Sequence, residues 1–212
     1  MREKPRKIYN KLLKHFGRQA WWPADSPFEV IVGAILTQNT NWRNVEKAIL
    51  NLKAARVLRP APLLKVSNAK LERLIRPSGF YKQKAKRLKG FIKEYHGKSV
   101  PRLRSGQGMS REELLAIKGI GPETADSILL YAFEEPTFVV DAYTRRIGQR
   151  VGLFDFDDYH EIKDYFEKNL PKNLEMYKEY HALLVELAKT YCRTKPQCRK
   201  CPINKLCYNY SQ

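Results

Sequence analysis

The sequence lacks any long apolar run. Hydrophobic residues make up 43% of its 212 residues, the fraction of an ordinary globular protein. No stretch approaches the roughly 18–20 consecutive apolar residues that a membrane span requires. The N-terminal segment Met1–Lys7 is charged and has no apolar core behind it, so it does not read as a secretory signal. These absences predict a soluble, cytoplasmic protein that binds no membrane.

Acidic residues are scarce. The chain has 22 Asp and Glu residues against 40 Lys and Arg residues, which gives a formal net charge of +18. This excess indicates a polyanionic partner, most simply nucleic acid. A basic surface that only keeps the protein soluble, or one that meets an anionic membrane, would give the same count. Charge alone does not distinguish DNA from RNA or from the ribosome.

Strand-like segments and repeats are also nearly absent. Only residues 137–140 resemble a strand, and four residues do not make a sheet. The prolines at 60 and 62 indicate a loop. Ser110 and Glu113 form a candidate capping box. Apolar periodicity predicts helices over residues 5–16, 42–52, 69–75, 82–95, 111–117, 123–133, 142–151, 159–169 and 177–190, with an apolar stretch over 28–36. The predicted fold class is all-α.

Cysteine is absent from the first 191 residues. All four cysteines lie in the last 21 residues, as Cys192-x5-Cys198-x2-Cys201-x5-Cys207. Such a group is a ligand set rather than a disulfide framework, and four thiolates can hold zinc or a [4Fe–4S] cluster. The basic residues around them would also contact phosphates: Arg193, Lys195, Arg199, Lys200 and Lys205.

Histidine is scarce too. The four histidines show no ligand spacing, so no chemistry is assigned to them: His15, His96, His160 and His181.

The most informative segment is Leu114–Asp126. A helix ends there at a tight turn that contains Gly119 and Gly121, and a second helix starts with Pro122 at its first position. Both glycines permit positive φ and close approach of another backbone. The N–H groups of the turn and of the new helix, with Lys118 beside them, suit a DNA phosphate. A plain helical hairpin is the alternative.

These features resemble the endonuclease III superfamily of base-excision DNA glycosylases, which combine a helix-hairpin-helix motif, a Gly/Pro-rich loop and a catalytic aspartate. The aspartate matches Asp141, 20 residues after Gly121, in the segment Phe138–Arg146. The likeness includes the segments Leu36–Thr40 and Gly79–Ala85 and covers nearly the whole chain. It implies a monomer that acts on double-stranded DNA with a damaged base and that, in a prokaryote, is associated with the nucleoid. It also implies a [4Fe–4S] cluster on Cys192, Cys198, Cys201 and Cys207, although the family's loop is usually one residue longer between the first two cysteines.

The resemblance further implies two helical lobes with DNA in a cleft between them. One lobe spans residues 26–136 and holds the hairpin; the other combines residues 1–25 with 137–212 and holds the cysteine loop at 192–207. Asp141 lies at the start of a predicted helix, where N–H groups and the helix dipole favour a carboxylate. A carboxylate there can stabilise an oxocarbenium-like sugar or activate a water. A purely structural helix cap is the alternative for Asp141.

Bifunctional members carry a lysine two residues after the second hairpin glycine, and here that position is Glu123. A carboxylate cannot form a Schiff base, so we expect a monofunctional glycosylase that uses water. The alternative for Glu123 is a first-turn residue favoured by the helix dipole.

The pattern resembles most closely the 3-methyladenine DNA glycosylase III type. In that subgroup the aromatic positions matching Trp21, Trp22, Pro23 and Trp42 line the pocket for a flipped base, with Glu123 beside it. A packing role for the tryptophans is the alternative. A cysteine cluster departs from this subgroup, whose members can lack it. Alkylated purines are therefore the expected substrate.

Further residues match the family's DNA contacts. Gln38 and Asn39 match the segment that fills the hole left by the flipped base, and Phe80 matches the residue that wedges between bases. A capped turn and a buried aromatic are the alternatives. Lys118, Gly119, Ile120 and Gly121 form the expected phosphate site. The run Lys82, Lys84, Lys86, Arg87 and Lys89 is either a phosphate face or a solvated helix face.

Three other functions stay open at this stage. One is a glycosylase and lyase for oxidised pyrimidines, and another is a mismatch glycosylase for adenine, thymine or uracil. The third, of another class, is a non-catalytic DNA-binding module, which the placement of Asp141 after the hairpin disfavours.

Overall fold

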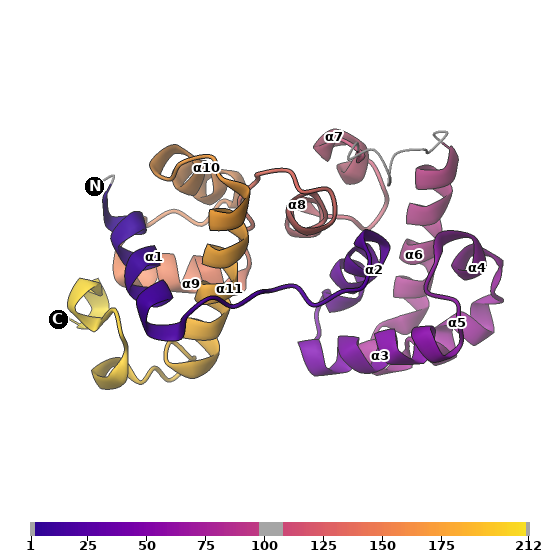
Figure 1. Cartoon of the computed structure of the whole chain (residues 1–212), viewed down its shortest axis with the longest axis horizontal. Coiled ribbons are helices and arrows are strands. Elements are labelled where there is room, and N and C mark those ends of the chain that lie inside the picture. The colour runs from indigo at the N-terminus through magenta and orange to yellow at the C-terminus, as the bar shows by residue number, and fades with distance from the viewer. Residues whose placement is uncertain (1–2, 98–107, 211–212) are drawn as a thin grey trace. The chain divides into compact units, whose positions relative to one another are not determined.

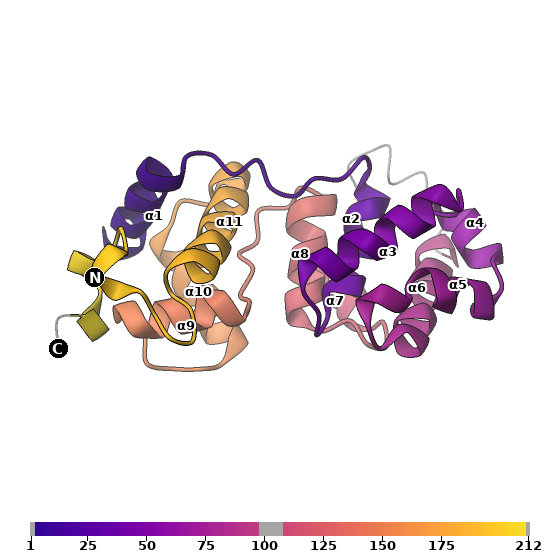
Figure 2. The ribbon, with the colours of Figure 1, turned by 90° about the horizontal axis from the view of Figure 1, so that it is seen from below.

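The computed structural model describes residues 3–97 and 108–210. The chain divides into two compact units, one of Trp22–Glu134 and the other of Met1–Trp21 with Glu135–Gln212. Figures 1 and 2 show the ribbon in two orientations. Every regular element in the described ranges is a helix, which confirms the predicted all-α class.

The Trp22–Glu134 unit is built around one buried helix, α2 (Pro27–Thr37). Ser26 caps it by accepting the Glu29 N–H, Pro27 occupies its first turn, and every residue from Phe28 to Leu36 is buried. Helices α3 (Trp42–Ala54), α6 (Tyr81–Gly97) and α8 (Pro122–Ala132) pack against it, and α2 lies between α6 and α8 in Figure 1. The remaining helices of the unit are α4 (Pro60–Lys65), α5 (Asn68–Leu74), η1 (Arg76–Ser78) and α7 (Arg111–Leu115).

The other unit packs α1 (Glu3–Phe16) and α9 (Ala142–Val151) against α11 (Leu174–Thr190), and α10 (Tyr159–Asn169) also packs on α1. Its core is aromatic: the rings of Phe138 and Phe166 stack with centroids 4.2 Å apart, and Tyr177 and Tyr180 meet Phe138 edge to face. The hydroxyl of Tyr180 donates to the Pro5 carbonyl at 2.9 Å. Three short helices follow in the C-terminal segment: η2 (Cys198–Lys200), η3 (Asn204–Leu206) and η4 (Tyr208–Tyr210).

Two sequence expectations need correction. The loop expected at Pro60 and Pro62 is helix α4, because both prolines fall in the first turn, where an N–H has no partner within the helix. The strand-like residues 137–140 form no strand within the described chain; they are an extended segment whose Phe138, Val139 and Val140 side chains are buried. Apolar content at 137–140 therefore reflects burial in the core rather than a sheet. No helix among the described residues is long and apolar enough to cross a membrane.

Candidate active site and nucleic-acid interface

Asp141 is the N-cap of helix α9. The buried segment 138–140 leads into it, its backbone is extended, and its Oδ1 accepts the Thr144 N–H at 2.7 Å. Its side chain is 15% exposed. Burial pushes the pKa of Asp141 upward, but His181 and the Thr144 amide together outweigh burial and hold that pKa below its ordinary value. Asp141 is therefore a partly accessible carboxylate that is ionised at neutral pH.

His181 lies beside this carboxylate. It is on α11, is 4% exposed, and its Nε2 is 3.6 Å from Oδ2 of Asp141. The ring of Trp21 packs on the imidazole with centroids 5.3 Å apart. Ligand spacing did not single out His181, because its partner is 40 residues earlier in the chain. Helical periodicity could have done so, since Tyr177, His181 and Leu184 share the buried face of α11.

The two adjacent tryptophans belong to different units. Trp21 contacts His181 in the unit that holds Asp141. Trp22 packs in the other unit, where its ring meets Trp42 edge to face and Tyr131 at a tilt, both with centroids 5.3 Å apart. A Cβ on Gly33 would lie 3.1 Å from the Trp22 ring, so the indole lies directly on the backbone of α2. Pro23 is exposed.

The predicted hairpin is present as α7, a tight turn and α8. Its capping box is confirmed, because Ser110 and Glu113 each accept the other's backbone N–H. Arg111 donates twice to the buried Asp126, at 2.8 and 3.1 Å, and thereby links α7 to α8. Ile120 is buried and fixes the turn in the core.

The two hairpin glycines differ. Gly119 has φ +92°, which glycine permits, and a Cβ there would lie 2.5 Å from Arg87 Nε. Gly121 has φ −95° and does not use the freedom that glycine permits; it is the N-cap of α8 and offers no side-chain cap. That arrangement leaves the first turn of α8 without a side-chain acceptor from its cap and suits an anion. Lys118 and Glu123 are both exposed, Glu123 in that first turn.

Gln38 is bound within its own unit. Its amide nitrogen donates to Gly119 O at 3.0 Å and to Thr124 Oγ1 at 2.9 Å, and its oxygen accepts from Arg87. Asn39, the next residue, is exposed and has φ +55°. Phe80 is 61% exposed with φ +45°. The structure therefore exposes Asn39 and Phe80, whereas Gln38 connects α2 to the hairpin.

Lys84 belongs to neither of the faces proposed for the basic run on α6. It is fully buried, and its Nζ donates to Ser78 O at 2.6 Å and to Leu36 O at 2.9 Å. These carbonyls lie just before the segments that carry Gln38 and Phe80. Burial, and after it the charge of Arg87, lowers the pKa of Lys84 to about 8. Periodicity could have indicated this, because Lys84, Leu88 and Phe91 share the buried face of α6.

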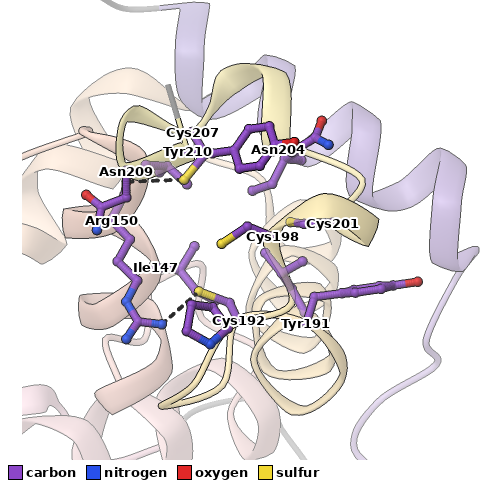
Figure 3. Close-up of a pocket in the computed structure, with 14 residues that line it drawn as sticks. Ile147, Arg150, Tyr191, Cys192, Cys198, Cys201, Asn204, Cys207, Asn209 and Tyr210 are labelled. Atoms are coloured by element: carbon purple, nitrogen blue, oxygen red, sulfur yellow. Dashed lines mark hydrogen bonds between the residues drawn. The ribbon is translucent and has the colours of Figure 1, made fainter. Parts of the chain in front are cut away.

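The four cysteines border one cavity of about 170 Å³ with otherwise largely apolar walls (Figure 3). Cys192 lies 3.6 Å from Arg150 Nη1, and the Cys207 thiol donates to Arg150 O at 3.3 Å. Burial raises the pKa of the Cys201 thiol to about 11 and also raises that of Cys207. Four thiols around one space have the donor chemistry of a site with four cysteine ligands. Nevertheless, no group of three or more His, Cys, Asp or Glu side chains in the described residues is arranged as a metal site.

The chain is similar to known base excision DNA repair proteins in both sequence and structure. A family model described as "HhH-GPD superfamily base excision DNA repair protein" matches residues 32–172. The chain is 54% identical over 207 residues to "Putative DNA repair glycosylase MJ1434" of Methanocaldococcus jannaschii, covering 95% of this chain and 94% of the relative. Among solved structures, a 3-methyladenine DNA glycosylase (MagIII) of H. pylori bound to 1,N6-ethenoadenine matches with TM-score 0.81 and 32% identity, over 87% of this chain and 97% of that one. A non-covalent endonuclease III–DNA complex matches with TM-score 0.85 and 25% identity, over 100% and 97%.

Proposed function

Because the chain belongs to the HhH-GPD superfamily of base excision DNA repair proteins and is a DNA glycosylase of that superfamily, we propose that it hydrolyses the N-glycosidic bond of alkylated purines in double-stranded DNA. The observation that carries this proposal is Asp141, whose carboxylate is held ionised at the start of α9. The products would be the free base and an abasic site.

Asp141 would act on the sugar. Breaking the glycosidic bond develops positive charge on the sugar ring, and a fixed carboxylate stabilises that charge. The same carboxylate would orient a water for attack at the anomeric carbon and accept its proton. The Thr144 N–H holds one carboxylate oxygen in place, so Asp141 would need little reorganisation during the reaction.

We propose a monofunctional enzyme because of the side chain at position 123. Glu123 lies in the first turn of α8, where bifunctional relatives are expected to carry the lysine that forms a Schiff base. A carboxylate cannot form an imine. The exposed lysine near this turn is Lys118, so trapping of a covalent adduct would point to that amine.

The substrate class rests on the aromatic residues. An N-alkylated purine carries positive charge and is already a good leaving group, so it needs an electron-rich surface more than a strong general acid. Trp22 and Trp42 would supply that surface, with a cation–π contribution of about 1–2 kcal/mol in a desolvated pocket. Glu123 would add a negative charge and Pro23 a further apolar wall. Trp21 remains a candidate for the same pocket, although here its ring contacts His181.

DNA would be held chiefly by the hairpin and by two exposed side chains. The turn from Lys118 to Gly121 would bind a phosphate. Asn39 would fill the space left by the flipped base, and Phe80, exposed on its strained backbone, would wedge between neighbouring bases. Gln38 would contact the DNA beside Asn39 only if its side chain breaks its hydrogen bonds to the hairpin and to Arg87 on α6.

We also propose a [4Fe–4S] cluster on Cys192, Cys198, Cys201 and Cys207. Support comes from the shared cavity and from the resemblance of the cysteine spacing to the family's cluster loop. Such a cluster would tie the C-terminal segment to α9 and could exchange an electron. Arg150 would neutralise part of the thiolate charge, because its side chain already lies beside Cys192.

A panel of duplexes with single lesions tests the substrate class. Under single-turnover conditions we expect methylated purines to be released at least about tenfold faster than thymine glycol, 8-oxoguanine, uracil or mismatched adenine. Trp22→Ala should slow release about 5–30-fold, the equivalent of the cation–π energy, with a smaller effect on DNA affinity. Leu50→Ala is the matched control, since Leu50 is 58% exposed on α3.

Two outcomes would contradict the proposal. Fastest release of an oxidised pyrimidine or a mismatched base would overturn the alkylpurine assignment. Borohydride added during turnover should trap no covalent protein–DNA adduct, and efficient trapping would show that the enzyme is bifunctional.

A further inference from the structure

His181 is a buried titratable residue to which the mechanism above gives no part. It lies on the inner face of α11, and its Nε2 approaches Oδ2 of Asp141 to 3.6 Å. The other carboxylate oxygen, Oδ1, accepts the Thr144 N–H. The two oxygens of Asp141 therefore face different elements, Oδ1 the first turn of α9 and Oδ2 the middle of α11.

The imidazole has little freedom to move away. Trp21 packs on one side of it with ring centroids 5.3 Å apart and an interplanar angle of 53°. Tyr177 and Tyr180, which precede it on α11, are fully buried and packed against Phe138. Burying an ionisable ring is costly unless it has a polar partner, and Asp141 is the acidic side chain beside it.

Several other charged groups of the surrounding elements have partners of their own. On α9, Arg145 pairs with Asp157 and Arg146 donates to Cys192 O. On α10, Glu167 pairs with Lys163 and accepts the Phe138 N–H. On α11 and α1, Glu179 accepts the Gln19 N–H, and Tyr9 packs on Tyr180. Among the described residues, the charged group that lowers the pKa of Asp141 is His181, not one of these.

We infer that His181 is a positioning residue for the proposed catalytic Asp141, holding Oδ2 from α11 while the Thr144 amide holds Oδ1 from α9. This inference rests on the proposed function. It gives the carboxylate two anchors from two helices, so its orientation toward the sugar would not depend on the helix cap alone. Misplacement by a fraction of an ångström at such a site is expensive in rate.

The sign of the pH effect follows from the charges. An imidazole beside the carboxylate favours the ionised form and lowers the pKa of Asp141. Replacing the imidazole by an uncharged group should raise that pKa, so the acid limb of the excision rate should move to higher pH. Helix packing by the ring would not produce this shift.

Two substitutions separate the polar contact of Nε2 from the electrostatic effect of the imidazole. His181→Gln keeps a donor near the position of Nε2 but removes the imidazole. We expect a plateau rate within about threefold of wild type and an acid limb shifted upward by about one pH unit. His181→Phe keeps the bulk and removes the donor, and its plateau rate should fall at least about tenfold. His160→Gln, at an exposed histidine on α10, is the matched control and should change neither.

A second readout needs no activity. The side-chain carboxyl carbon of Asp141, assigned by NMR with the Asp141→Asn variant, can be titrated in wild type and in His181→Gln. We expect a wild-type pKa below the ordinary value of 3.8 and a higher one in the variant. If neither His181 variant folds, a wild-type value at or above 3.8 would still overturn the inference.

The two proposals can fail separately. If the enzyme excises bases through Asp141 but His181→Gln leaves both the acid limb and the Asp141 titration unchanged, His181 is only a packing residue. If no base is excised, the proposed function fails, while the titration still shows whether His181 and Asp141 are coupled.

Discussion

Single residues set the chemistry that this chain can perform. Asp141 is ionised because polar partners outweigh its burial, whereas Lys84 shows the opposite balance. Lys84 has two carbonyl partners, no carboxylate of the described residues pairs with it, and burial lowers its pKa to about 8. A buried cation without a counter-ion weakens the folded state. We interpret the Lys84 amine as a structural donor that links the end of α2 to the segment before Phe80 through its two hydrogen bonds.

The low pKa of Lys84 predicts a pH-dependent stability. Below about pH 8 the amine is charged in both folded and unfolded chains, and the folded state bears the full cost of burying that charge. Between about 8 and the ordinary value of 10.5, the unfolded chain binds a proton that the folded one does not, so stability rises with pH. The Lys84→Met variant lacks this rise in stability with pH. It also leaves two buried carbonyls without their donor, which should lower the free energy of unfolding by about 1–3 kcal/mol.

Urea unfolding at several pH values checks this. The free-energy difference between wild type and Lys84→Met should widen from pH 8 to pH 10, whereas Lys82→Met, at an exposed position of the same helix, should stay near wild type. A constant difference across this window would mean that Lys84 titrates normally.

At the scale of elements, the hairpin and the cysteine loop carry the proposed DNA contact and the proposed cluster. The hairpin turn is fixed from three directions: Gln38 binds the Gly119 carbonyl, Arg87 covers the Gly119 backbone, and Ile120 is buried. The cysteine loop is held by short-range backbone hydrogen bonds and by Arg150 of α9, which donates to two of its carbonyls. Its four thiols border a cavity that a cluster would fill. Because burial raises the thiol pKa of Cys201 and Cys207, cluster binding must release protons and should weaken at low pH.

The cysteine loop yields a direct prediction. Protein purified under iron-replete conditions should be brown and contain about four iron atoms per chain. Cys198→Ser should lose most of this iron and become susceptible to limited proteolysis after α11, because metal binding contributes folding free energy. Thr194→Ala, at an exposed position of the same loop, is the control and should retain its iron. Stoichiometric zinc without iron would contradict the assignment.

At the scale of the whole molecule, the sequence predicted the helical class and most helices closely. The predicted helices over 142–151 and 159–169 have the observed ends, because each has an aspartate cap and a regular apolar stripe. Prolines at 60 and 62 led to a wrong loop prediction because proline is equally compatible with a first helical turn. The apolar segment 137–140 resembled a strand because it is buried in a core rather than in a sheet.

The candidate site was only partly predictable, for a physical reason. Asp141, the hairpin and the cysteines each lie within one local motif, so the sequence could single them out as candidates, Asp141 through the family resemblance. The pairs His181–Asp141 and Gln38–Gly119 join residues far apart in the chain, and no local pattern encodes such contacts. Likewise, no local pattern indicates that the neighbours Trp21 and Trp22 pack in different units.

The central claim is that Asp141 drives base excision, and single-turnover release of the preferred base by Asp141→Asn tests it most directly. The variant should fold, keep its DNA affinity and release the base at least about 100-fold more slowly, since a charge used in the transition state is worth about 3 kcal/mol. Asp158→Asn, which changes another helix-capping aspartate, should release it at the wild-type rate. Near-normal release by Asp141→Asn would contradict the account and assign the catalytic role to another residue.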